Sequence, residues 1–286
     1  MKNALFILAG IILIAVGLGL YLFRNDSRAS VSPPPIVEPD IPPDPRPPAP
    51  VFHPWNGFPV GSWAVVQTSQ VRDNVSTTTR EKYTVAEIRP DGPVLGFRKA
   101  VGDTFEEPGA LLKPNCGSLV EAQTQWKASE PTTEKLEIGG KPQECRVTVY
   151  FYENPEKKIL NRVAVWRSTV IKVPYRQLQR NGPDVALPPD VLRIEFHVQA
   201  DDQYQKYDFR VTSLEAPIKV GDRDIPCVVE EGTVDVLRKG VATKGRLKRW
   251  LSDAVPGRVV KSEYAGEEAG KPVERTETML SFEVKK

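Results

Sequence analysis

Histidine is scarce in this chain, with two in 286 residues, and the usual motifs of catalysis are missing. Neither His53 nor His197 has a Cys or His neighbour at metal-ligand spacing, which argues against a metal centre. No Gly-x-Ser-x-Gly elbow and no glycine-rich phosphate loop occurs, which argues against a nucleophilic triad and a nucleotide site. We therefore predict no catalytic residue, no metal and no cofactor, and we expect that the protein is not an enzyme.

The histidines and the paired carboxylates have simple interpretations. His53 stands at the end of a proline-rich segment, where we expect it to be solvated. His197 shares the strand parity of Arg193, so we expect it to point away from the core. The acidic pairs Asp201-Asp202 and Glu267-Glu268 lie in polar, turn-like segments. Such residues are mostly exposed, which favours solvent contact over acid–base chemistry.

Cysteine is also scarce, with three residues: Cys116, Cys145 and Cys227. The absence of Cys-x-x-Cys argues against thiol redox chemistry, and the absence of cysteine from the first hundred residues argues against a lipid-modified N-terminus. Outside the cytoplasm a disulfide is permitted, and the candidate pairs are Cys116–Cys145 and Cys145–Cys227. The alternative, which we favour, is that Cys145 and Cys227 are small buried apolar residues at strand starts.

An excess of one charge is missing as well, because the formal net charge is only +2. This value argues against a nucleic-acid partner. One basic cluster is formed by Arg238, Lys239, Lys244, Arg246, Lys248 and Arg249. If residues 244–251 form a strand, every second side chain shares one face. The candidate ligand or partner surface is then Lys244, Arg246, Lys248 and Trp250. The alternative, which we favour, is a solvated face whose lysines protect a sheet edge from aggregation.

Charged residues are absent from the long apolar run between Ala4 and Phe23. At ~1.5 Å per residue this run makes roughly 30 Å of helix, enough to cross a bilayer core. A cleaved signal peptide needs a shorter apolar core, about 7–15 residues, followed by small residues, whereas residues 20–23 are bulky. We therefore predict a single-pass transmembrane anchor at residues 1–24, with the membrane as partner through residues 4–23.

The orientation of this anchor follows from its flanks. A short N-terminal flank before a large C-terminal part usually places that part outside the cytoplasm, although Lys2 and the α-amino group nearly balance Arg24 and Arg28 in the positive-inside count. We therefore expect an extracytoplasmic, periplasmic location for the C-terminal region.

The segment at residues 25–56 is dominated by proline. Between Pro33 and Pro50, ten of eighteen residues are proline. Proline favours extended polyproline II, so this stretch predicts a semi-rigid spacer of roughly 55 Å. The alternative is a PxxP ligand for a proline-binding module, but a proline-rich stretch beside a membrane anchor favours the spacer.

The remaining residues show the alternation of β-strands. Four segments combine β-branched or aromatic residues with period-two patterning: residues 63–68, 82–88, 146–151 and 193–198. Glycine and proline pairs separate them as turns, and no long stretch repeats apolar residues at helical spacing. We therefore predict a mainly β fold with an antiparallel sheet.

Two stretches repeat the same order of features. The first has Gly139, Cys145, a tryptophan strand at residues 165–168 and Val173-Pro174. The second has Gly221, Cys227, a tryptophan strand at residues 249–252 and Val255-Pro256. Such a repeat predicts two tandem related units, a first at residues 57–182 and a second at 183–286.

The second unit carries a longer pattern. Gly221-x5-Cys227 is followed by Trp250-x-Ser252-x-x-Val255-Pro256-Gly257-x-Val259-Val260-Lys261. This pattern resembles one in secreted or anchored bacterial proteins, notably of planctomycetes. Their β-rich domains are similar to the lipoprotein-carrier superfamily, which contains LolA-like, LolB-like and RseB-like half-barrels. The resemblance covers mainly residues 188–286 and transfers no catalytic residue.

This resemblance implies a long antiparallel sheet, half-barrel-like, curved around an apolar concavity that accepts acyl chains or peptide segments. The expected function is therefore a membrane-anchored, extracytoplasmic binding module, not an enzyme, that holds a lipid, an acyl chain or an extended peptide. The alternative is a structural or interaction protein of the cell envelope that acts through its surface on an envelope protein.

Overall fold

The computed structural model describes residues 53–286 except positions 91, 107–109, 113–115, 118–125 and 179–183. These residues belong to one compact unit, 48–286. The described part is mainly antiparallel β-sheet with a 3-10 turn, η2 (Pro155–Lys157), and no α-helix, which confirms the mainly β prediction. The predicted anchor at residues 1–24 and most of the predicted linker lie outside the described residues. Within the described part, no helix has the length and apolar character that crossing a membrane requires.

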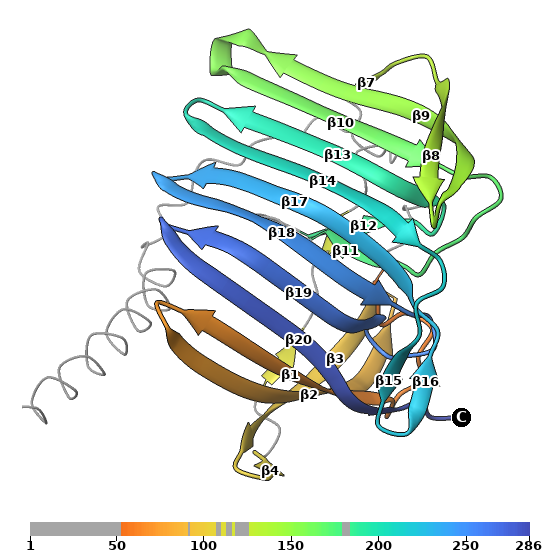
Figure 1. Ribbon diagram of the computed structural model, residues 1–286, viewed down its shortest axis with the longest axis vertical. Helices are drawn as coiled ribbons and strands as arrows, with labels where there is room; N and C mark the ends of the chain where they lie inside the picture. The colour runs from red at the N-terminus through yellow and green to blue at the C-terminus, as the bar shows by residue number, and fades with distance from the viewer. Residues whose placement is uncertain (1–52, 91, 107–109, 113–115, 118–125, 179–183) are drawn as a thin grey trace, which may run out of the picture. The chain divides into compact units, whose positions relative to one another are not determined.

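One large sheet of fifteen strands forms the body of this unit (Figure 1). Its strands, in spatial order, are β4 (Thr104–Phe105), β3 (Gly92–Val101), β2 (Val75–Arg89), β1 (Trp63–Arg72), β20 (Lys271–Glu283), β19 (Val259–Glu268), β18 (Val241–Leu251), β17 (Val228–Arg238), β14 (Gln203–Ser213), β13 (Val191–Ala200), β10 (Ile159–Arg167), β9 (Lys141–Asn154) and β7 (Lys127–Ala128). Two further strands complete it: β5 (Ala110–Leu112) beside β3, and β8 (Thr132–Ile138) beside β9.

The order of the strands does not follow the order of the chain. β1 pairs with β20, so strands of the proposed first unit flank those of the proposed second unit on both sides. β3, β2 and β1 lie on one flank, and β10 and β9 lie on the other. The strands of both proposed units therefore belong to one continuous sheet, and the division at residue 183 stays a prediction.

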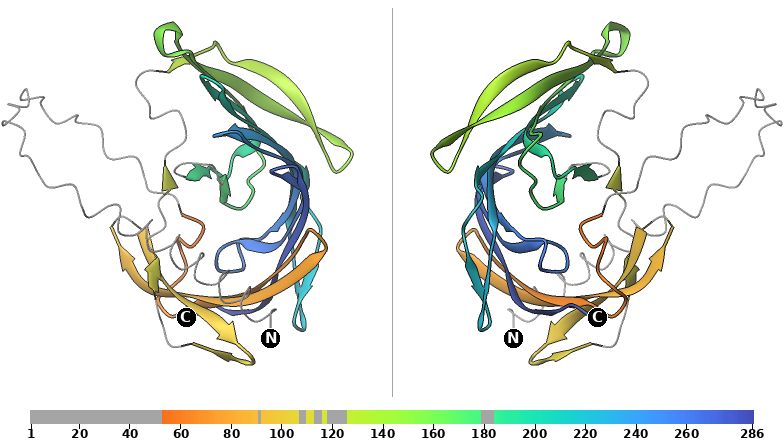
Figure 2. Two further views of the ribbon diagram at one scale, coloured as in Figure 1. Left: turned by 90° about the vertical axis from the view of Figure 1, so that its left-hand side faces the viewer. Right: turned by 90° about the vertical axis from the view of Figure 1, so that its right-hand side faces the viewer.

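The sheet is curved, and shorter segments lie inside the curve (Figure 2). The inner segments include β11 (Arg176–Leu178) and β12 (Asp184–Leu187), which form a small sheet with β6 (Cys116–Gly117). A separate hairpin is made by β15 (Ile218–Val220) and β16 (Arg223–Ile225). We call the side of the large sheet that faces β11 and β12 the concave face, and the opposite side the outer face.

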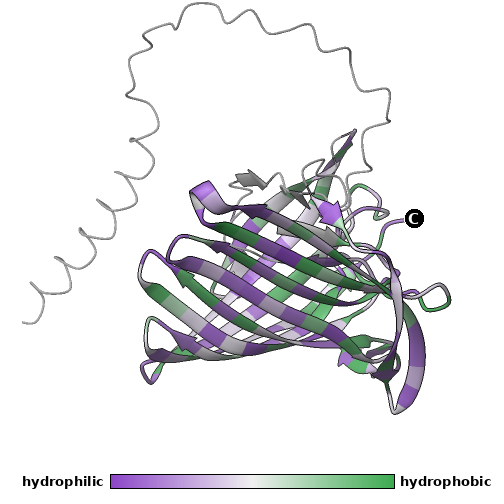
Figure 3. Ribbon diagram, turned by 90° about the horizontal axis from the view of Figure 1, so that it is seen from above, coloured by the Kyte–Doolittle hydropathy of each residue, from purple (hydrophilic) through white to green (hydrophobic). Residues whose placement is uncertain are grey.

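Alternation of apolar and polar residues explains why the sheet has two different faces (Figure 3). In β13, Ile194 and Phe196 are buried, whereas Arg193 and Glu195 beside them are partly exposed. Phe196 lies opposite Tyr207 of β14, and Ile194 lies opposite Phe209. Period-two patterning places all of these side chains on the concave face, where they pack in one cluster with Leu187 of β12.

Glycines in the middle of two long strands allow aromatic rings to lie flat on the concave face. Gly232 of β17 lies opposite Phe209, and a Cβ on Gly232 would overlap the Phe209 ring and the Asp208 carbonyl oxygen. Gly245 of β18 is covered in the same way by the ring of Tyr264. Because glycine has no side chain at these two positions, the rings can pack directly on the strands and form the floor of the concavity.

We expect Gly232→Ala to destabilise the protein by about 1–3 kcal/mol, because the added methyl overpacks against a ring and a backbone oxygen. Gly96→Ala is the matched control, since a Cβ there meets only the Thr84 carbonyl at 3.8 Å. Guanidinium unfolding of both variants measures the difference. Equal midpoints for the two variants would show that the ring can move aside at no cost.

The repeated features occupy equivalent positions in the structure. Ser168 and Ser252 follow the tryptophan strands β10 and β18, are buried, and accept hydrogen bonds from backbone amides two residues later, 3.2 Å and 3.3 Å away respectively. Both tryptophan strands have a register shift at their last residues. Val173 and Val255 are buried. The local contacts therefore repeat along with the sequence.

Candidate functional site

Three inner segments lie over the concave face at residues 53–58, 173–177 and 252–258. Trp55, Phe58 and Val255 pack in one core cluster with Val260 of β19 and Met279 of β20. The Trp55 ring continues into an aromatic row with Tyr83 and then Phe97, at centroid distances of 6.3 Å and 5.4 Å. The last residues of the predicted linker are thus part of the folded core.

His53 is buried, with 4% of its surface exposed, so the expectation that it is solvated is wrong. Its Nδ1 accepts a hydrogen bond from the Trp55 amide at 3.2 Å. Burial, and then the positive charge of Arg258, lower the pKa of His53 to about 4. The imidazole is therefore neutral at pH 7, as a buried hydrogen-bond acceptor should be. The proline-rich sequence around His53 does not reveal this burial, because the residues that bury His53 come from distant strands.

A cavity of about 480 Å³ lies between the inner segments and the concave face. Its apolar wall includes Trp55, Val66, Leu95, Leu251, Val260 and Met279. Its polar wall includes Glu81, Tyr83, Arg176, Gln177, Arg249 and Glu277. We call it the inner cavity. It has the mixed lining of a site for a molecule with an apolar part and a polar part.

A second hollow of about 520 Å³ adjoins the inner cavity along the concave face. Both are lined by Arg249, Val259 and Glu277. Rings and aliphatic side chains form much of its wall: Tyr207, Phe209, Val234, Val236, Leu247 and Tyr264. Glu268 and Arg275 also line the second hollow. The two hollows together make a groove with apolar and charged walls, with Arg249 at the boundary.

Arg249 belongs to a buried triad with Arg176 and Glu230. Arg176 Nε lies 3.0 Å from Glu230 Oε1, and Arg249 Nε donates to Glu230 Oε2 at 2.9 Å. The side chains of Arg176 and Glu230 are each 1% exposed and that of Arg249 is 10% exposed. The triad joins β11 of the inner layer to β17 and β18 of the large sheet.

Backbone oxygens complete the triad. Arg249 Nη1 donates to the carbonyl of Gln177 at 2.7 Å, and Arg176 Nη2 donates to the carbonyl of Val191. The Arg249 guanidinium also lies over the Phe209 ring, 5.5 Å from its centroid. These contacts fix the inner strand β11 against the sheet and fix both guanidinium groups in position.

Electrostatics inside the triad are unbalanced. Burial alone would raise the pKa of Glu230, but the charges of Arg249 and Arg176 and the Arg249 hydrogen bond outweigh it and lower that pKa. Burial lowers the pKa of Arg176, and Glu230 partly offsets this. With Glu230 ionised and both arginines protonated, the three groups have a formal charge of +1.

Two carboxylates line the inner cavity on the other side, on β2 and β20. Glu81 Oε2 accepts a hydrogen bond from Tyr83 at 2.7 Å, and Glu277 Oε2 accepts one from Ser262 at 3.2 Å. Burial and the Glu81 hydrogen bond raise the pKa of Tyr83, so this phenol stays protonated. The cavity therefore has a basic wall and an acidic wall.

The predicted surface Lys244, Arg246, Lys248 and Trp250 lies on the outer face, opposite the cavities. Cross-strand acids neutralise two of its members: Lys248 Nζ lies 2.8 Å from Glu231, and Lys244 Nζ lies 3.6 Å from Asp235. β18 lies inside the sheet between β17 and β19, so the interpretation that its lysines protect a sheet edge is wrong. The surface stays a candidate partner surface.

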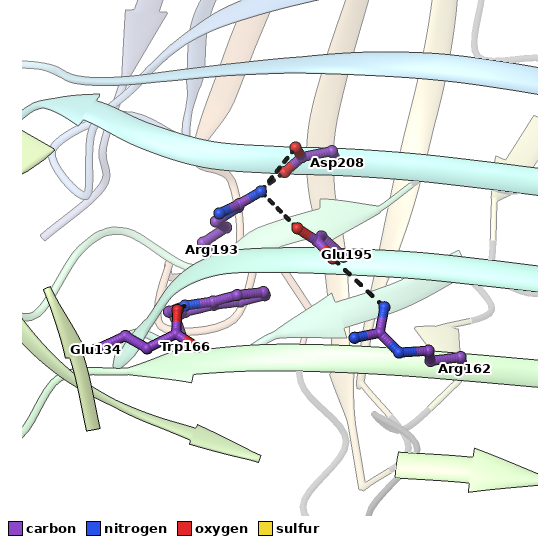
Figure 4. Close-up of polar contacts among 6 residues, drawn as sticks. All are labelled: Glu134, Arg162, Trp166, Arg193, Glu195 and Asp208. Atoms are coloured by element: carbon purple, nitrogen blue, oxygen red, sulfur yellow. Dashed lines mark hydrogen bonds and ion pairs between the residues drawn. The ribbon is translucent and has the colours of Figure 1, made fainter. Parts of the chain in front are cut away.

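The same outer face carries a second polar network nearer β10 (Figure 4). Arg193 lies over the Trp166 ring at 4.5 Å and donates to Asp208 at 3.0 Å. Glu195 bridges Arg193 and Arg162, with the Arg162 ion pair at 3.6 Å. These alternating charges stabilise neighbouring strands by cross-strand pairing.

His197 lies on β13 among the outer-face charges, as the parity predicts. Burial, Lys206 and Arg162 lower its pKa. No cluster of metal-ligating residues occurs among the described residues.

Cys145 and Cys227 are free and buried, so they do not pair with each other. Each thiol contacts the carbonyl two residues earlier, Gln143 at 3.8 Å and Ile225 at 3.3 Å. Burial raises the pKa of Cys227 to about 11 and also raises that of Cys145. Both therefore remain thiols at neutral pH. The candidate pair Cys116–Cys145 does not form either, because Cys145 is free.

Comparisons with known proteins add one distant likeness. No protein-family model and no curated protein matches the chain. A structure search finds the hypothetical lipoprotein YmcC from Escherichia coli (K12), at 11% sequence identity, covering 76% of this chain and 83% of that chain, with a TM-score of 0.26. A likeness of this size supports no conclusion about function.

Proposed function

We propose that the protein is a membrane-anchored, extracytoplasmic, non-enzymatic binding module that holds the apolar chain of a lipid in the inner cavity. The observation that supports this most directly is the cavity itself, about 480 Å³ in volume and adjoined by the second hollow. Ligand sites in proteins typically measure ~300–1,000 Å³ and have mostly apolar walls with a few fixed polar groups.

The walls of the cavity suit an acyl chain better than a compact polar molecule. Trp55, Leu95 and Met279 provide adaptable apolar surface, and methionine in particular adjusts to irregular ligands. The adjoining hollow extends this surface along the concave face toward Phe209 and Tyr264. A long, narrow, apolar ligand can use both hollows, whereas a small polar one would leave the aromatic walls unfilled.

The anchor at residues 4–23 and a spacer at residues 25–52 belong to the same proposal. An apolar helix would hold the cavity at a membrane, and the proline-rich spacer would let it reach ligands away from the bilayer surface.

Val66→Trp should abolish ligand binding in the inner cavity. Val66 is half-buried and lines this cavity from β1, so a larger ring there fills the space that the ligand needs. The full chain is placed in phosphatidylcholine nanodiscs with a sixteen-carbon fatty acid that carries a photoactivatable diazirine near its tail. Mass spectrometry then locates the crosslinks, and we expect them at cavity residues in the wild type and at least about tenfold fewer in the variant, a loss that corresponds to ~1.4 kcal/mol.

Val71→Trp on the outer face of the same strand is the matched control, because Val71 is 41% exposed and lies outside both hollows. This variant should crosslink like the wild type. Crosslinks confined to residues 4–23 in every sample would reject the cavity as a lipid site and favour a structural or interaction protein of the envelope.

A further inference from the structure

The buried triad has one more positive charge than it needs. Two guanidinium groups share the single carboxylate of Glu230, and the side chains of Arg176 and Glu230 are each only 1% exposed. Burying an uncompensated charge is costly, and proteins usually place a counter-ion beside it. Asp190, the other acid that acts on Arg176, already forms an ion pair with Arg167 at 2.7 Å. Among the residues that the structure describes, no further carboxylate therefore pairs with this charge.

Arg176 also has an unused donor. Its Nη1 is buried and has no hydrogen-bond partner among the described residues. A planar guanidinium is suited to bind two oxygens of a carboxylate or phosphate at once. Because Arg176 and Arg249 both line the inner cavity, the unmet charge lies at a place where a ligand can supply a counter-charge.

The acidic wall of the inner cavity limits where an anionic head group can bind. Glu81 and Glu277 line the inner cavity on β2 and β20 and repel an anion there, whereas Arg176 and Arg249 line it on β11 and β18 and attract one. Within the inner cavity, an anionic head group is therefore favoured at the arginine wall. From that point the apolar chain can extend along either hollow.

We propose that the ligand of the inner cavity is an amphiphile with an oxyanion head group, a carboxylate or a phosphate, bound by Arg176 and Arg249. This inference rests on the proposed function and deepens it by naming the ligand class. The positive charge of the triad then serves recognition, and Glu230 holds the two guanidinium groups in the geometry that the head group needs.

A series of probes with one chain and four head groups tests the inference on the unmodified full chain. The probes are sixteen-carbon carboxylate, phosphate monoester, alcohol and trimethylammonium, each with the diazirine at the same carbon, in phosphatidylcholine nanodiscs. The readout is the crosslink yield at cavity residues divided by the yield at residues 4–23 of the same sample. We expect the better of the two anionic probes to exceed the alcohol by at least about tenfold, as charged hydrogen bonds would give, and the ammonium probe to be weakest.

The outcomes separate the two proposals. A higher yield for carboxylate than for phosphate identifies a free fatty acid as the source, the reverse identifies a phospholipid-type ligand, and both support the inference. Equal cavity yields for the alcohol and the anions overturn it while leaving the lipid-binding function intact. The absence of cavity crosslinks from all four probes rejects the function itself.

Arg176→Met adds a second test. It leaves Glu230 paired with Arg249 in a neutral pair, so the variant should keep its fold, as thermal unfolding will check. Its preference for the anions over the alcohol should fall to about onefold. Arg210→Met on the outer face removes a positive charge from β14 without touching either wall of the inner cavity, and should keep the wild-type preference. Equal preferences in the two variants would overturn the role of Arg176, and the wild-type series decides the inference if Arg176→Met does not fold.

Discussion

Glu230→Gln should destabilise the protein by about 3–5 kcal/mol, because it leaves two buried guanidinium groups without a counter-charge. The shape of the side chain hardly changes, so packing contributes little to the loss. Guanidinium unfolding of the full chain, followed by tryptophan fluorescence, measures it. The same carboxylate holds β11 on the sheet, so the inner segment should also become more open to proteolysis.

Glu231→Gln is the control for this experiment because the two residues are neighbours that point to opposite faces of β17. Glu231 pairs with Lys248 on the outer face at 2.8 Å, and both side chains are 42% exposed. Exposed pairs of this kind contribute about 0–1 kcal/mol. Equal losses in the two variants would contradict the assignment of Glu230 as the buried centre of the triad.

Stability should fall by about 3 kcal/mol as the pH drops from about 6.5 to about 4, because of His53. The pKa of the folded state, about 4, lies below the ordinary value of 6.5. Between these values the unfolded chain binds more protons than the folded one, so stability rises with pH across this window and is lost on acidification. Unfolding midpoints at pH 7, 5.5 and 4 measure the effect.

His53→Asn isolates this contribution. Its short side-chain amide can still accept the hydrogen bond from the Trp55 amide but does not titrate. The variant should lose markedly less stability than the wild type over the same pH range. Identical pH profiles would place the acid sensitivity elsewhere, for instance in carboxylates that titrate in the same range.

The sequence predicts the local structure of this protein well. Period-two alternation identifies the four strands at residues 63–68, 82–88, 146–151 and 193–198, and each lies within an observed strand. Alternation is visible in a single sequence because successive side chains of a half-buried strand point alternately to the core and to solvent. The pairing of β1 with β20 is not visible in this way, because it depends on which distant strand edge is free.

The site was harder to predict than the strands. Arg249 lies in a basic cluster of the sequence, although it shares the parity of the apolar residues Leu247 and Leu251. Glu230 likewise shares the parity of Val234 and Val236. A charged residue at an apolar position of a strand is the available signal for a buried ion pair. Arg176 gave no such signal, because it lies in a short inner strand without alternation.

The pairing of the first long strand with the last has a consequence for how the chain folds during its synthesis. Gln70 accepts a hydrogen bond from Arg275 Nε across 205 positions of the sequence, and Ser62 accepts one from the Lys285 amide across 223 positions. β1 and β2 can form a hairpin early, but one edge of β1 remains unpaired until β20 has been made. Contacts of such long range slow folding and expose strand edges meanwhile. A nascent chain that stops before β20 would therefore present a long, adhesive strand edge, and its protection would depend on chaperones rather than on the fold.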